Sequence, residues 1–147
     1  MLAKELMTKN VEVGNPDMTL VEAARKMKEG DFGMLPIGEN DRLVGTITDR
    51  DITVRGVADG KDVNECKVRE VMSQGIHYCF EDQDLDDISQ KFSNQQIRRV
   101  PVLNRDKRLV GILSLGDLSQ SQLDPQKVEQ TLSQISKESG ESRASLQ

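Results

Sequence analysis

Apolar side chains first recur along the chain at intervals of three and four residues, the spacing of one face of a helix. This stripe consists of Leu20, Ala23, Ala24 and Met27. Thr19, followed three positions later by Glu22, has the pattern of an N-terminal capping box. Gly30 is the expected C-cap. The pattern therefore predicts an amphipathic helix between Thr19 and Gly30.

The next apolar positions form two short runs, residues 34–37 and 43–47, separated by the polar residues 38–42. Two such runs around a polar turn predict a strand hairpin. The polar residues that follow the second run indicate a further helix, which we expect to begin near Thr48.

The same order of segments recurs about 65 residues later. For example, Pro101 takes the place of Pro36 in a matching strand. An equivalent helical stripe, strands over 99–103 and 109–113, and a helix beginning near Ser114 are expected in the second copy. The matched pairs of segments are Ala3-Lys4-Glu5-Leu6-Met7 with Val68-Arg69-Glu70-Val71-Met72, Leu35-Pro36-Ile37 with Val100-Pro101-Val102, and Leu43-Val44-Gly45 with Leu109-Val110-Gly111.

The chain is therefore predicted to be a tandem repeat of a β-α-β-β-α unit, in the α/β (α+β) class. One unit is too small to cover both faces of its sheet, so we expect the two copies to pack sheet to sheet. The expected boundaries are 1–60 for the first repeat, 61–67 for a linker, 68–122 for the second repeat, and 123–147 for a C-terminal helix and disordered tail.

The C-terminal helix is expected to begin with Asp124 as N-cap and Pro125 in its first turn. Val128, Leu132 and Ile135 form one apolar stripe on it. This stripe indicates packing, either on the helix's own domain or on a partner subunit. The polar residues 138–147 are expected to be disordered.

Composition excludes some classes of partner. The 147 residues include 20 Lys and Arg against 25 Asp and Glu, a net charge of −5, and only 3% aromatic residues. General electrostatic binding to nucleic acid or to an anionic membrane is therefore not expected, nor is the stacking of bases on aromatic side chains. We also expect no signal peptide and no transmembrane helix, and the two cysteines do not suggest a disulfide framework. Together these features predict a cytoplasmic protein.

Candidate chemistry lies at two matched strand-to-helix junctions, Thr48-x-x-Asp51 and Ser114-x-x-Asp117. Each pair could be a capping box that stabilises its helix without any ligand. Alternatively, the hydroxyl and the helix N-terminus could face a phosphate while the carboxylate accepts hydrogen bonds from the cis-diol of a ribose. Spacing leaves both interpretations open.

Basic residues and glycines near these junctions are further candidates. Arg50 could reach a phosphate or pair with a neighbouring carboxylate, and the pair Arg98-Arg99 could bind an anion or simply be solvated. Gly45 and Gly111 lie in strands, where a glycine often lets a ligand approach the backbone.

Catalysis and metal binding have little support. His77 is the only histidine of the chain. It shares a strand face with Cys79 and could begin a metal site with Cys66, but zinc requires four ligands, usually at closer spacing. No base, nucleophile and oxyanion donor can be assembled, so we expect neither an enzyme nor a metal protein.

Taken in order, these segments resemble a CBS-domain pair, also called a Bateman module, over residues 1 to about 122. The layout is similar to that of small stand-alone two-CBS proteins. The features that carry the resemblance are the two openings that end in Met7 and Met72, the strands around Pro36 and Pro101, the Leu-Val-Gly segments, and the two Thr/Ser-x-x-Asp junctions.

The resemblance implies that adenine nucleotides (AMP, ADP or ATP), or less often S-adenosylmethionine, NAD or metal ions, bind in clefts between the two repeats. By residue type it implies that Asp51 and Asp117 hold ribose while Thr48 and Ser114 face phosphate. No resident cofactor is implied.

A basic residue two positions before the strand proline often meets phosphate in this family. Arg99 has that position in the second repeat and Met34 in the first, so tighter phosphate binding is expected near Arg99. The resemblance also implies a homodimer and an effector protein, which the sequence does not identify. The expected function is that of an adenosine-nucleotide sensor, and the alternative is a ligand-free protein-interaction or stress-associated scaffold.

Overall fold

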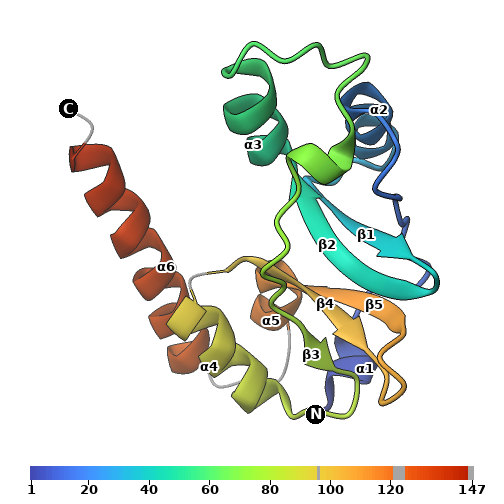
Figure 1. Ribbon diagram of the computed structural model, residues 1–147. Helices are drawn as coiled ribbons and strands as arrows, with labels where there is room; N and C mark the ends of the chain where they lie inside the picture. Colours follow the sequence, from blue (N-terminus) through green and yellow to red (C-terminus); the bar gives the residue numbers. More distant parts are fainter. Residues whose placement is uncertain (96, 121–124, 146–147) are drawn as a thin grey trace. The chain divides into compact units, whose positions relative to one another are not determined.

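The computed structural model describes residues 1–95, 97–120 and 125–145 (Figure 1). The chain divides into two compact units, each named here after the repeat whose hairpin it contains. The first-repeat unit consists of Val11–His77 and Lys107–Leu109, and the second-repeat unit of Met1–Asn10, Tyr78–Asp106 and Val110–Gln147.

The first-repeat unit contains one two-stranded antiparallel sheet, formed by β1 and β2, with helices around it. Leu35 of β1 lies opposite Ile47 of β2, and both are fully buried. Burial of a side chain of this size stabilises a fold by about 1.5–3 kcal/mol. The elements are α2 (Leu20–Gly30), β1 (Met34–Glu39), β2 (Arg42–Thr48), α3 (Asp49–Asp51), the π-helical η1 (Ile52–Val57) and the 3-10 helix η2 (Val68–Glu70).

The hairpin turn is shorter than the predicted polar segment 38–42. Only Asn40 and Asp41 lie outside the strands, with φ of 55° and 62°. Two successive left-handed residues form the type of turn whose twist matches that of the flanking strands. Strand pairing therefore continues to Glu39 and Arg42.

The capping box predicted for α2 is confirmed. The Glu22 amide donates to Thr19 Oγ1 at 3.2 Å, and the Thr19 amide donates to Glu22 Oε2 at 3.1 Å. The predicted C-cap is wrong by one residue, because Asp31 and not Gly30 takes the left-handed conformation, with φ 54°. Gly30 instead leaves room for the ring of Phe32, since a Cβ at position 30 would lie 2.5 Å from that ring.

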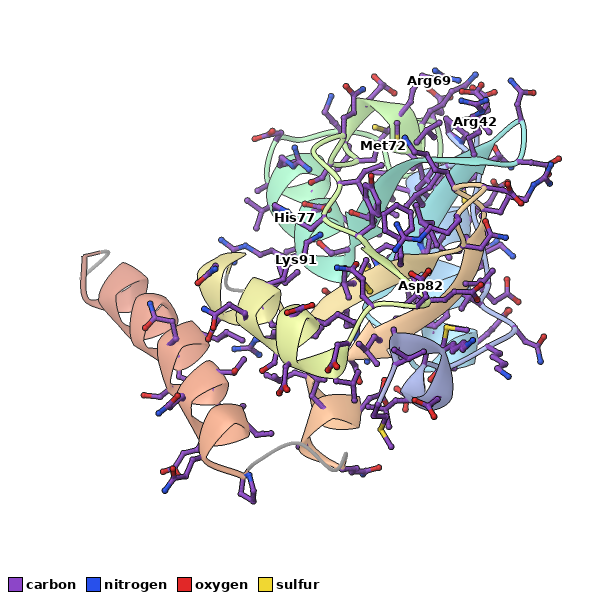
Figure 2. The ribbon with its side chains drawn as sticks, turned by 90° about the horizontal axis from the view of Figure 1, so that it is seen from below. Arg42, Arg69, Met72, His77, Asp82 and Lys91 are labelled. Atoms are coloured by element: carbon purple, nitrogen blue, oxygen red, sulfur yellow. The ribbon has the colours of Figure 1, made fainter. Side chains whose placement is uncertain are left out.

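The second-repeat unit contains a three-stranded sheet in the order β3-β4-β5. β3 pairs in parallel with β4, and Cys79 lies opposite Val102. Lys91 of α4, labelled in Figure 2, donates a hydrogen bond to the Tyr78 carbonyl beside β3. The elements are α1 (Ala3–Leu6), β3 (Cys79–Phe80), α4 (Leu85–Gln95), β4 (Arg99–Leu103), β5 (Leu109–Ser114), α5 (Leu115–Ser119) and α6 (Pro125–Ser145).

The strand expected at the start of each repeat is short. In the first-repeat unit it is a single parallel bridge between Gly14 and Ile37, and in the second-repeat unit it is the two-residue strand β3. The mixed α+β class and the two hairpin strand pairs of the repeats are otherwise as predicted.

Each repeat contributes its opening segment to the unit of the other repeat. Ala3, from the opening of the first repeat, is fully buried in the core of the second-repeat unit. Val68 and Val71, from the opening of the second repeat, are buried in the core of the first-repeat unit. Arg69, between them, forms a 2.8 Å ion pair with Asp17 and lowers the pKa of that carboxyl group (Figure 2).

The strand glycines accommodate these exchanged openings and not a ligand, which corrects our interpretation of Gly45 and Gly111. A Cβ on Gly111 would lie 2.6 Å from the Met7 sulfur and 2.8 Å from the Thr8 carbonyl oxygen. A Cβ on Gly45 would lie 2.9 Å from the sulfur of Met72 and 2.8 Å from the Ser73 carbonyl oxygen. The atoms that approach these two glycines closely therefore belong to the opening segments of the chain itself.

The C-terminal helix α6 begins at Pro125, as predicted, whereas its predicted N-cap, Asp124, lies outside the described residues. It packs beside α4 in its own unit (Figure 1). Ile135 is 3% exposed and Thr131, also 3% exposed, shares a 3.1 Å hydrogen bond with Ser89 of α4. Packing on its own domain, one of the two alternatives, is therefore observed. The helical backbone continues to Ser145, through most of the segment expected to be disordered.

Candidate functional site

The two strand-to-helix junctions both form capping boxes. At the first, the Thr48 amide donates to Asp51 Oδ2 at 2.9 Å and the Asp51 amide donates to Thr48 Oγ1 at 3.0 Å. At the second, the Ser114 amide donates to Asp117 Oδ2 at 2.9 Å and the Asp117 amide donates to Ser114 Oγ at 3.1 Å. All four side chains are partly exposed, so the caps do not remove them from solvent.

The junctions differ in what remains available to a ligand. Asp51 Oδ1 accepts a 3.0 Å hydrogen bond from the Arg55 guanidinium, and the Asp51 side chain is only 17% exposed. Asp117 Oδ1 has no hydrogen-bonding partner among the described residues. A carboxylate oxygen accepts about two hydrogen bonds, so Asp117 retains more acceptor capacity than Asp51.

Sequence reasoning did not identify Arg55. The signal was present, because an acidic residue four positions before an arginine is a typical helical ion pair. Arg50, which was predicted to reach phosphate, lies exposed on α3, and its amide donates to Asp49 Oδ1 at 2.8 Å. Its guanidinium contacts neither Thr48 nor Asp51 through a hydrogen bond in the described structure.

A cavity of about 480 Å³ lies within the second-repeat unit and contains two of the predicted site residues, Arg99 and Ser114. The volume is in the range of small-molecule sites. Asp117, one turn along α5, is not part of the lining. The lining residues are Arg98, Arg99, Ser114, Leu115, Gly116, Leu132, Ile135 and Ser136.

A backbone hydrogen bond holds the arginines of this cavity close to Ser114. The Leu115 amide, at the start of α5, donates to the Arg98 carbonyl, just before β4, at 2.8 Å. Arg98 and Arg99 are both exposed, and neither guanidinium forms an ion pair or hydrogen bond with a described residue. The cavity thus presents, next to Ser114, two cations that have no counter-ion among the described residues.

Three of the lining residues belong to α6 and were not predicted. Leu132, Ile135 and Ser136 follow Ser114 by about 20 residues, and no local pattern places them against it. The apolar stripe identified the helix, but a stripe does not specify which surface it contacts.

A second cavity, of about 440 Å³, lies beside the β1–β2 turn in the first-repeat unit and includes none of the predicted site residues. Glu39 and Asp41 line it together with Arg42 and Arg108, and Arg108 lies 3.7 Å from Asp41. Its charges are mixed, so it has no clear preference for an anion.

His77 and Cys79 do not form a site with each other. His77 is exposed, whereas Cys79 is 1% exposed, and the two belong to different units. Burial raises the pKa of the Cys79 thiol to about 11. Within residues 1–95, 97–120 and 125–145, no three His, Cys, Asp or Glu side chains are grouped closely enough to hold a metal ion.

The Cys79 thiol is expected to resist alkylation in the folded protein. At pH 8 a thiol with a pKa near 11 has almost no thiolate, which is the reactive form, and burial blocks the reagent. Peptide mapping after treatment with iodoacetamide should show little modification of Cys79 without denaturant and complete modification in 6 M guanidinium chloride. Equal labelling in both conditions would contradict the burial of this side chain.

Comparison with known proteins agrees with this architecture. The chain matches the CBS domain family twice, over residues 3–56 and 68–124. The CBS domain-containing protein YhcV of Bacillus subtilis is 38% identical over 133 residues, which are 90% of this chain and 94% of that protein. This chain therefore belongs to the CBS-domain family, and the predicted resemblance is confirmed.

Two solved structures extend the comparison. Hypoxic Response Protein I, solved with two coordinated zinc ions, has a TM-score of 0.75 and 36% identity, covering 82% of this chain and 98% of the other. The CBS domain pair of protein MJ0100, solved in complex with 5'-methylthioadenosine and S-adenosyl-L-methionine, has a TM-score of 0.73 and 29% identity, covering 82% and 94%. CBS pairs are thus similar to this chain in fold, and one of them binds adenosine compounds.

In the part of the chain that the structure describes, no helix has both the length and the apolar character needed to cross a membrane.

Proposed function

We propose that this chain is a sensor of adenosine nucleotides of the AMP, ADP and ATP class, and that it binds them first at the second-repeat cavity. The observation that carries the proposal is that Arg98 and Arg99, whose guanidinium groups have no partner among the described residues, line a cavity of about 480 Å³ together with Ser114. Guanidinium groups bind phosphate oxygens through short, charge-assisted hydrogen bonds. The complex of the MJ0100 pair with adenosine compounds supports an adenosine-containing ligand.

The residues are assigned as follows. Arg99 and Ser114 bind the phosphate, and Asp117 accepts hydrogen bonds from the ribose diol through the oxygen that the cap leaves free. In the first repeat, Thr48, Arg50 and Asp51 form a weaker site, because Asp51 is already paired with Arg55 and the position equivalent to Arg99 is the buried Met34.

The output of the sensor is a ligand-dependent change in the pair of repeats or in a homodimer, read by an effector protein. Such a change requires that the ligand prefer one arrangement over another. We place the protein in the cytoplasm, since both of its cysteines are free and buried.

The proposal is tested by thermal melting with AMP, ADP, ATP, NAD and S-adenosylmethionine at millimolar concentration. A ligand at one hundred times its Kd adds about 2.7 kcal/mol of stability, so the Tm of a chain of this size is expected to rise by about 5–10 °C. If none of the five ligands raises the Tm, the sensor proposal is wrong and a ligand-free scaffold is favoured.

Arg99→Ala is expected to weaken nucleotide binding about ten- to hundredfold, because a hydrogen bond to a charged group contributes about 1.5–3 kcal/mol. Its basal Tm should change little, since Arg99 has no described partner. Arg25→Ala, which removes an exposed arginine of α2, is the matched control and should leave the affinity unchanged. Isothermal titration calorimetry measures both, and equal affinities would remove Arg99 from the site.

A further inference from the structure

We propose that the C-terminal helix α6 is a wall of the ligand site, and that Leu132 contacts the apolar ring of a nucleoside phosphate whose phosphate lies at Arg98 and Arg99. This inference rests on the proposed function and adds to it the element that recognises the ring part of the ligand. It also assigns a role to a helix that lies outside the two family matches, which end at residue 124.

The orientation of α6 leaves an apolar side chain uncovered. Its apolar stripe predicts that Leu132 and Ile135 are buried together, but only Ile135 is buried, whereas Leu132 is 43% exposed. Leu132 nevertheless lines the same cavity as Ile135 and Ser136. A large apolar side chain that lines a cavity without being covered can still bury its surface against a ligand.

The composition of the cavity fits a ligand with both a charged and an apolar part. The lining combines the cations Arg98 and Arg99 with the apolar residues Leu132 and Ile135 of α6. A free inorganic anion would satisfy only the cations, and an uncharged ring would contact only the apolar residues. An amphiphilic anion that joins a phosphate to a planar ring matches both, and a nucleoside phosphate has this chemistry.

The helix α6 is attached to its unit through α4. Among the side chains described within residues 125–136, the buried ones are Ile135 and Thr131, and Thr131 shares its hydrogen bond with Ser89 of α4. The described part of this interface with α4 therefore includes a polar pair as well as the apolar Ile135. A ligand that contacts Leu132 and Arg99 at once would link α6 to β4 and would therefore stabilise its packed position.

The test compares Leu132→Ala with Ser133→Ala in the full chain, since Ser133 is the neighbouring exposed residue of α6 and does not line the cavity. Titration calorimetry with AMP and ATP should show an affinity about three- to tenfold lower for Leu132→Ala and an unchanged affinity for Ser133→Ala. Leu132→Glu should weaken binding by more than tenfold, because its carboxylate would compete with phosphate for the arginines.

Two further measurements separate ring recognition from other causes. Inorganic pyrophosphate, which has no ring, should bind Leu132→Ala as well as it binds the unaltered chain. Hydrogen exchange followed by mass spectrometry should show slower exchange of the α6 amides over residues 128–136 when AMP or ATP is added.

The outcomes distinguish this inference from the proposed function. Two results would refute the role of Leu132 while the sensor function stands, provided that the unaltered chain binds nucleotide. In the first, Leu132→Ala binds nucleotide as tightly as the unaltered chain does. In the second, Leu132→Ala lowers the affinity for pyrophosphate as much as it lowers the affinity for nucleotide. Unchanged exchange of α6 in a nucleotide complex would also refute it. If the unaltered chain binds no nucleotide, both proposals fail together.

Discussion

A chain that lacks residues 1–10 is expected to lose the fold of its second-repeat unit while its first-repeat unit stays folded. The deleted segment buries Ala3 completely and packs Leu6 and Met7 against the same core. Five backbone hydrogen bonds also join it to described residues of the unit: those between Ala3 and Gln83, Lys4 and Glu81, Met1 and Leu85, and two between Thr8 and Ile112. At about 1 kcal/mol each, their loss approaches the whole stability of a small domain.

Hydrogen exchange at single-residue resolution measures this effect. The amides of β4 and β5 should lose their protection in the shortened chain, whereas those of β1 and β2 should keep it. Lys4→Ala changes an exposed side chain in the same segment and should alter the stability by less than about 0.5 kcal/mol. Protection of β4 and β5 that survives the deletion would show that the unit does not depend on the exchanged opening.

Gly111→Ala is expected to lower the free energy of unfolding by about 1–3 kcal/mol, the usual cost of inserting atoms into a packed region. The new Cβ would lie 2.8 Å from the Thr8 carbonyl oxygen, which is backbone and is fixed by the bridge between Thr8 and Ile112. The Met7 sulfur can rotate away, but the carbonyl can move only if the bridge shifts. Gly45→Ala should have a similar effect through Ser73.

Urea unfolding followed by circular dichroism compares these variants with Gly75→Ala. A Cβ at Gly75 meets no atom within 4 Å, so this control should be neutral or stabilise the fold slightly by restricting the unfolded chain. If Gly111→Ala is as stable as Gly75→Ala, the close approach at Thr8 does not constrain the sequence.

The features that sequence reasoning predicted correctly are local. Thr19, Thr48 and Ser114 each precede an acidic residue by three positions, and each forms a capping box, which was the expectation for Thr19 and one of two open interpretations for Thr48 and Ser114. The strands around Pro36 and Pro101 were recognisable because apolar residues on both sides of a polar turn predict paired strands. The period of about 65 residues then identified the two copies without any structural information.

The features that it missed depend on contacts between distant segments. The match between Glu5 and Glu70 revealed two openings, but similarity of sequence does not show into which core each opening packs. In the same way, the spacing of Leu132 and Ile135 predicted a helix and left its contact surface open. Gly45 and Gly111 were assigned to a ligand because a strand glycine signals close approach without showing what approaches.

The exchanged openings have a consequence for the origin of the protein. A chain that consisted of one repeat alone would have a gap in its own core. The opening segment of a second copy would have to fill that gap, and the two copies would exchange their openings. Such an ancestor would be folded only as a swapped dimer and would come apart on dilution. Fusing the two copies into one polypeptide removes the dependence on protein concentration, because the two repeats that exchange openings then belong to the same chain. We therefore expect a chain of half this length to fold only as an obligate dimer.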